Sequence, residues 1–140
     1  MNKKIAVVLS GCGFLDGSEV QEAVLTLLHL ARAGSEYHCF APDIEQTTNI
    51  NHATKDSSPE KRNVLVESAR IARTNIKNVK DLKAAEFDGI IFPGGFGAAL
   101  NLCDFAKRGP DCGVLPEIKR VILDFYLAQK PIGAICIAPA

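Results

Sequence analysis

The sequence predicts an α/β protein whose parallel sheet is sandwiched between helices. Two short apolar runs, residues 5–9 and 89–92, lack the alternation of polar and apolar residues that a half-exposed strand shows. Stretches with the helical spacing of apolar residues separate such runs, and loops rich in glycine and proline join them. Because parallel strands need crossover helices, this alternation predicts a parallel sheet.

The first predicted strand, residues 5–9, is followed by a glycine-rich loop. Ser18, with Gln21 three residues later, has the spacing of a capping box at the start of a helix. The helix that follows carries its apolar residues on one face, namely Val20, Ala23, Val24, Leu27, Leu28 and Ala31. Gly34 is expected to end this helix.

The middle of the chain is less regular. Residues 37–41 predict a second strand, which Pro42 and Asp43 end. Residues 45–62 are polar and without clear periodicity, and they predict a long surface loop or flap. Residues 64–72 predict a short helix.

The last third of the chain predicts two more strands. Residues 89–92 form a buried strand closed by a glycine-rich turn, and residues 103–110 form an irregular segment. A helix is indicated by the apolar stripe of Leu115, Ile118, Val121, Ile122, Phe125 and Tyr126. Residues 132–135 predict the last strand, with Cys136 at its end. A covering helix should follow but the sequence stops at Ala140, so we expect residues 1–140 to be the amino-terminal part of a single domain, or a fold completed by another molecule.

Composition restricts the class of protein. The chain has 140 residues, 47% of them hydrophobic, and a formal net charge of zero, which fits one ordinary domain and argues against a nucleic-acid-binding surface. The amino terminus resembles a lipoprotein signal with Cys12 as the lipidated residue, but the apolar run 5–9 is shorter than a signal core of about 7–15 residues. No run reaches transmembrane length. The five cysteines include no C-x-x-C pair, so we expect reduced thiols in a cytoplasmic protein and no metal site.

Chemistry is expected at the carboxyl ends of the strands, where open parallel sheets bind their ligands. Glu19 follows the first strand, Gly94 and Gly95 follow the strand 89–92, and Cys136 follows the last strand. A thiolate at a sharp turn is a nucleophile, and a nearby carboxylate can move protons. The amides of Gly94, Gly95 and Ile137 are candidate donors to an oxyanion.

Each of these residues also has a structural interpretation. Buried cysteines are mostly inert, a glutamate in the first turn of a helix favours that helix, and paired glycines commonly form a turn. Cys12 either packs or lines the rim of the crevice, and His52 in the flap is the histidine best placed to reach the crevice. Cys39 is expected in the core. Cys103 and Cys112 allow a redox role, with no specific signal for one.

Several motifs together match a known family. They are Ser10-Gly11-Cys12-Gly13, Asp16-Gly17-Ser18-Glu19, Phe40-Ala41-Pro42-Asp43, Arg62-Asn63-Val64-Leu65, Ser68-Ala69-Arg70-Ile71-Ala72-Arg73, Phe92-Pro93-Gly94-Gly95-Phe96-Gly97-Ala98-Ala99 and Cys136-Ile137-Ala138-Pro139. In these motifs the chain resembles the ElbB family (enhancing lycopene biosynthesis protein) of the class I glutamine amidotransferase-like superfamily. The resemblance implies a flavodoxin-like fold and a longer full-length protein.

The resemblance also implies an activity and its residues. It implies a glutathione-independent glyoxalase, a lyase that converts glyoxal to glycolate, whose apparent activity could reflect protein deglycation. Cys136 matches the superfamily nucleophile, Glu19 the supporting acid, and Gly94 and Gly95 the oxyanion loop. Ala134 and Ala138 stand where the amidotransferase elbow has glycines, and Ile137 stands where the intracellular proteases have histidine. These departures argue against amidotransferase and protease chemistry.

The expected reaction begins with addition of the Cys136 thiolate to one aldehyde of glyoxal, after which Glu19 moves a proton between the two carbons and water releases glycolate. The partner would be a small dicarbonyl; no cofactor, nucleic acid or membrane is expected, and a homodimer is left open. The alternative is a non-catalytic module linked to isoprenoid metabolism, which binds a metabolite or senses oxidants through its cysteine.

Overall fold

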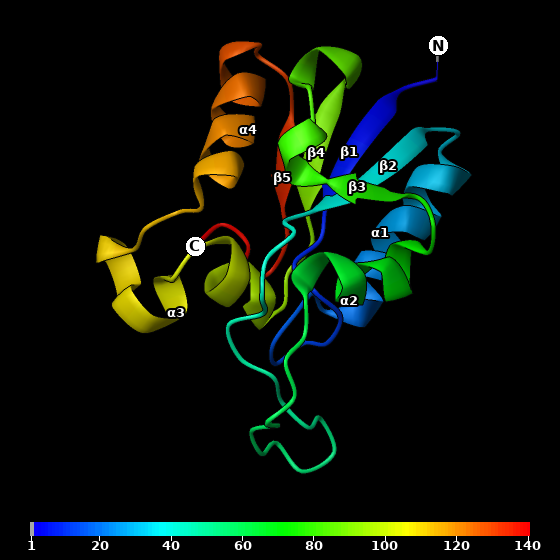
Figure 1. Cartoon of the computed structure of the whole chain (residues 1–140). Helices are drawn as coiled ribbons and strands as arrows, with labels where there is room; N and C mark the ends of the chain where they lie inside the picture. Colours follow the sequence, from blue (N-terminus) through cyan, green and yellow to red (C-terminus); the bar gives the residue numbers. More distant parts are fainter. Residues whose placement is uncertain (1) are drawn as a thin grey trace.

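A computed structural model describes residues 2–140, and it confirms the α/β class with a parallel sheet. The five-stranded sheet has the order β3-β2-β1-β4-β5, and all four pairings are parallel (Figure 1). The strands are β1 (Lys4–Val8), β2 (Glu36–Ala41), β3 (Ile76–Asn78), β4 (Gly89–Phe92) and β5 (Ile132–Ala134). The α-helices are α1 (Val20–Arg32), α2 (Val64–Ala72), α3 (Phe105–Arg108) and α4 (Pro116–Leu127). Short turns of other helix types are η1 (Val79–Asp81), η2 (Ala84–Glu86), η3 (Ala98–Leu102, a π-helix) and η4 (Gly109–Asp111).

Two hydrophobic cores lie on opposite faces of the sheet. Because successive strand residues point to opposite faces, β1 sends Val7 into one core and Val8 into the other. The Val7 core is closed by α1 and α2, and the Val8 core is closed by α4 and the η1–η2 segment (Figure 1). Both faces of β1 are thus buried, which explains its continuous apolar run.

Helix α1 begins one residue later than the capping-box pattern predicts. Its N-cap is Glu19, whose side chain accepts from the backbone of Glu22. Ser18 is instead buried, and its Oγ accepts a hydrogen bond of 2.8 Å from the Ser10 amide. Val24 and Leu28, expected in the core stripe, are half-exposed. The helix ends at Arg32, shortly before Gly34 as expected.

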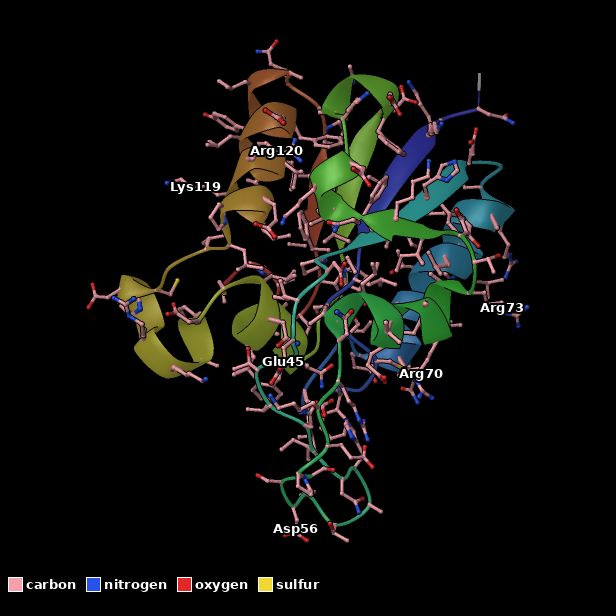
Figure 2. All side chains as sticks on the ribbon, viewed as in Figure 1. Glu45, Asp56, Arg70, Arg73, Lys119 and Arg120 are labelled. Carbon is pink, nitrogen blue, oxygen red and sulfur yellow. The ribbon has the colours of Figure 1, made fainter. Side chains whose placement is uncertain are left out.

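The flap is irregular, as predicted. It leaves β2 and returns to α2, and two isolated bridges, Glu45 with Asn63 and Ile50 with Ser57, hold its arms together. Figure 1 shows the flap beyond the carboxyl edge of the sheet, and Figure 2 places Asp56 near its tip. The base is pinned to η3, because the Asn101 side chain accepts from the Thr47 amide at 2.9 Å.

The segment between α2 and β4 differs from the prediction. Strand β3 has only three residues, too few to show a periodic pattern in the sequence. Arg120 on α4 holds the neighbouring turn by donating to the carbonyls of Val79 at 3.2 Å and Leu82 at 3.1 Å (Figure 2). After β5, residues 136–139 form turns rather than a helix. Within residues 2–140, no helix combines the length and apolar character needed to cross a membrane.

Candidate active site at the end of strand β5

Cys136 lies at a sharp turn just after β5. The strand is held in place to its last residues, since the amide of Ile135 donates to the carbonyl of Phe92 on β4 at 3.0 Å. The backbone of Cys136 has φ of 57°, a left-handed conformation that residues other than glycine rarely adopt. The residue is exposed. The turn therefore presents the thiol at the carboxyl edge of the sheet, as the sequence predicted.

Gly94 is the point where three elements meet. Its carbonyl accepts from the amide of Glu19 at 2.8 Å, and its own amide donates to Oε2 of Glu22 at 2.8 Å. A Cβ built on Gly94 would stand 2.7 Å from Cβ of Cys136 and would collide with Oε2 of Glu22. The start of α1, the end of β4 and the turn after β5 thus converge at a position with no room for a side chain.

The two glutamates of this region have different tasks. The carboxylate of Glu19 accepts the backbone N–H of Glu22 at 2.7 Å, which makes it the N-cap of α1. The carboxylate of Glu22 is the one that reaches Gly94 beside Cys136. Sequence reasoning missed Glu22, although residues three apart share one side of a helix and this spacing could have indicated it.

The predicted oxyanion donors differ in availability. The amide of Gly94 is occupied by Glu22. Among residues 2–140, no protein acceptor takes the amides of Gly95 or Ile137. Gly95 has φ of +96°, and a Cβ on it would collide with the backbone of Glu19 and Gly17. Its amide is therefore held at a fixed place on the β4 side of the Cys136 turn.

The other two predicted residues, Cys12 and His52, make their contacts elsewhere in the molecule. Cys12 faces a groove between α1 and α2 that Val24 and Arg70 also line, and burial, followed by the charge of Glu67, raises the pKa of its thiol. Figure 2 shows Arg70 on the α2 side. His52 Nε2 accepts from the Leu15 amide at 3.3 Å, so the histidine lies on the glycine-rich loop.

That loop connects His52 to the site indirectly. The His52 ring packs edge-on against Phe14, with 5.5 Å between ring centroids. The Phe14 carbonyl accepts from the amide of Phe96 at 2.8 Å, next to Gly95. His52 is thus connected to Gly95 only indirectly, through Phe14 and Phe96.

An apolar groove of about 210 Å³ adjoins the Cys136 turn. Its wall includes Phe92, Cys103, Ile118, Ala134 and Ala138. Within the described residues no group of three or more histidine, cysteine or acidic side chains could hold a metal ion.

Similarity to known proteins places this parallel sheet in the class I glutamine amidotransferase-like superfamily. The chain is 55% identical over 137 residues to the mitochondrial ES1 protein homolog of Rattus norvegicus, covering 97% of this chain and 52% of that protein. It is 53% identical over 137 residues to the mitochondrial glutamine amidotransferase-like class 1 domain-containing protein 3 of Homo sapiens, covering 97% and 51%. The chain thus spans about half the length of these curated relatives.

Solved structures agree with this class. The crystal structure of an isoprenoid biosynthesis protein with an amidotransferase-like domain from Ehrlichia chaffeensis matches with a TM-score of 0.92 and 45% identity, over 97% of this chain and 64% of that chain. A two-domain protein with a DJ-1/ThiJ/PfpI-like domain from Anabaena variabilis matches with a TM-score of 0.58 and 18% identity, over 99% and 30%, which shows the shared fold alone. No family model matches the chain.

These similarities support the superfamily but do not single out the ElbB family within it. They also correct one expectation. The prediction of a cytoplasmic protein is contradicted, because the similar rat and human proteins are named mitochondrial. Reduced cysteines and the short apolar run at the amino terminus indicated a reducing compartment but could not distinguish one such compartment from another.

Proposed function

We propose that this chain carries the nucleophile of an ElbB-type, glutathione-independent glyoxalase that converts glyoxal to glycolate. The observation that carries the proposal is the convergence of Cys136 and the Glu22 carboxylate on Gly94. A thiol for addition to a carbonyl and a carboxylate for proton transfer are the two groups that this isomerisation and hydrolysis require.

The reaction uses the site in three steps. The Cys136 thiolate adds to one aldehyde carbon, and the carbonyl oxygen becomes the hydroxyl of a hemithioacetal. Glu22 then takes the proton from this carbon and returns a proton to the second carbon through an enediol, which leaves a thioester. Water hydrolyses the thioester to glycolate and frees the thiol, so the overall change is glyoxal plus water to glycolate.

Two backbone amides can stabilise the negative charge that develops on oxygen during these reaction steps. Within residues 2–140 the amides of Gly95 and Ile137 donate to no protein acceptor, so they are the donors we assign to the oxyanion of the addition and hydrolysis steps. Gly94 then has another task, since its amide orients Glu22. In this proposal Glu22 replaces Glu19 as the proton-transfer group, because the Glu19 carboxylate caps α1.

Protein deglycation is a related activity that the same groups support, because a glycated amine or thiol presents a similar carbonyl-derived carbon. The proposal needs a small dicarbonyl or its adduct as partner and involves no nucleic acid and no membrane. The second candidate is an oxidant-sensing or metabolite-binding module linked to isoprenoid metabolism. It is favoured by the exposure of Cys136 and by the name of the similar Ehrlichia protein.

The decisive experiment is to incubate the chain with glyoxal and to follow glycolate by proton NMR, in the wild type, in Cys136→Ser and in the matched control Cys12→Ser. We expect glycolate from the wild type and from Cys12→Ser, and none above background from Cys136→Ser. Equal rates from wild type and Cys136→Ser would refute the proposal. Selective peroxide oxidation of Cys136 without any glycolate would favour the second candidate.

A further inference from the structure

The segment between Cys103 and Val114 is a loop with closed ends. Cys103 and Val114 form an isolated antiparallel bridge, and the Leu115 amide donates to the carbonyl of Leu102 at 3.0 Å. One position further into the loop, the Asp104 amide donates to the Gly113 carbonyl at 3.1 Å. Short α3 and η4 fill the interior of the loop. The two ends therefore run side by side as a short antiparallel ladder.

This ladder brings two cysteines to the same side. Cys103 lies opposite Val114, and Asp104 lies opposite Gly113. Cys112 comes just before Gly113 and is therefore two positions from Val114 on the same arm. Positions two apart along a strand point to the same face, so Cys112 lies diagonally across the ladder from Cys103. The two thiols interact, since the Cys112 side chain contributes to the pKa of Cys103. The returning arm is also fixed, because the Gly113 amide donates to Oδ1 of Asp104 at 2.6 Å.

The environments of the two thiols differ. Cys103 is buried, and its Sγ donates to the carbonyl of Ala98 at 3.4 Å, whereas Cys112 is half-buried. Burial raises the pKa of the Cys103 thiol; a hydrogen bond with the Phe105 backbone opposes this rise, and the Cys112 side chain adds to it. An oxidant from solvent therefore reaches Cys112 first.

We propose that Cys103 and Cys112 form a reversible disulfide when the protein meets a peroxide. The Cys112 thiolate attacks one peroxide oxygen, the O–O bond breaks, and Cys112 becomes a sulfenic acid while hydroxide leaves. The Cys103 thiolate then attacks Sγ of Cys112, the S–S bond forms and the sulfenic oxygen leaves as water after taking a proton. The two electrons lost by the thiols reduce the peroxide, and an external dithiol restores both thiols.

This modification is separate from the proposed glyoxalase reaction, although it is close to it. Cys103 is part of the wall of the apolar groove beside the Cys136 turn. Closing the disulfide ties that wall to the loop 103–112 and leaves Cys136 as a free thiol.

The sequence offers a direct test. Trypsin cleaves after Lys83, Lys107, Arg108 and Lys119, so Cys103 and Cys112 fall on the separate peptides 84–107 and 109–119. We would treat the folded chain with one equivalent of hydrogen peroxide, block the remaining thiols with iodoacetamide, digest and analyse by mass spectrometry. The expected product is the linked peptide pair, which dithiothreitol separates. Because the Cys103 thiolate closes the bond, its formation should accelerate as pH rises.

The controls make the result specific. The linked pair should be lost in Cys103→Ser and in Cys112→Ser and kept in Cys12→Ser. Oxidation of the folded wild type that stops at sulfinic acid, or that links either cysteine to Cys136, would overturn the proposal. The wild-type result decides the case even where a serine variant folds poorly.

Discussion

Glu19 and Glu22 form a pair at the start of α1, in which the carboxylate of Glu19 accepts the backbone N–H of Glu22 at 2.7 Å. This bond satisfies one of the free amides at the helix start. It also fixes the helix start so that the Glu22 side chain reaches the amide of Gly94, next to Cys136. Glu19 thus positions the helix, and Glu22 reaches the glycine beside Cys136.

Single substitutions of Glu22 and Glu19 should have different effects, the first on turnover and the second on stability. Glu22→Gln should lower glycolate formation by about 10²-fold or more, the usual loss when a proton-transfer group is removed, with little change in stability. Glu19→Ala should lower the free energy of unfolding by about 1 kcal/mol, the cost of a lost cap. Urea unfolding and glyoxal turnover measure the two effects. A Glu22→Gln variant with full turnover would contradict the assignment.

Gly94→Ala should damage both the fold and the site. The added methyl group would stand 2.8 Å from the carbonyl oxygen of Ile135 and 2.7 Å from Cβ of Cys136, and neither backbone-bound atom can easily move. We expect a loss of about 1–3 kcal/mol in unfolding free energy, typical of overpacking, and loss of turnover. The matched control is Gly113→Ala, whose methyl would meet its nearest neighbour only at 3.9 Å. Equal stability of the two variants would show that the close approach at Gly94 is absent.

The turn at Cys136 predicts an unusual response to glycine. Its φ of 57° is costly for a residue with a Cβ and acceptable for glycine. Cys136→Gly should therefore be more stable than Cys136→Ala, by up to about 1 kcal/mol in chemical denaturation. Both variants should lose turnover. A glycine variant clearly less stable than the alanine variant would indicate an ordinary backbone at this position.

Asp88 should contribute to the loss of stability in acid. A hydrogen bond from the Lys4 amide, then one from the Lys3 side chain, lowers the pKa of this carboxyl group. A lowered folded-state pKa means that the contribution is present above the unfolded value of about 3.9 and is lost as pH falls through the folded value. As the pH falls through this range, the free energy of unfolding should decrease less in Asp88→Asn than in the wild type. Urea titrations at successive pH values measure this difference. Parallel curves for the two proteins would argue against this contribution.

Most of the fold could be predicted because its central elements are buried on both sides. Strands β1 and β4 show continuous apolar runs, and α4 shows a clear apolar stripe with Pro116 at its first position. Strand β3 could not be found in this way. It has three residues, of which Lys77 is exposed, and its place depends on pairing with β2 rather than on its own pattern.

The candidate site was predictable in position but not in every residue. Cys136, Gly94 and Gly95 follow the strands whose carboxyl ends meet, so the topology brought them to one edge. Helical spacing could have added Glu22 as a second candidate beside Glu19, but choosing between the two depends on where α1 begins. A capping-box pattern at Ser18 places that start one residue early, whereas burial of Ser18 against Ser10 moves the cap to Glu19.

The central claim is that Cys136 bonds covalently to the substrate and that Glu22 acts after this addition. Carbon-13 NMR of the chain with carbon-13-labelled glyoxal tests it most directly, by comparing wild type, Glu22→Gln and Cys136→Ser. We predict a sulfur-bound carbon signal that builds up in Glu22→Gln, passes on to glycolate in the wild type and is missing in Cys136→Ser. The same sulfur-bound signal in Cys136→Ser, or none in either of the other two proteins, would contradict the claim.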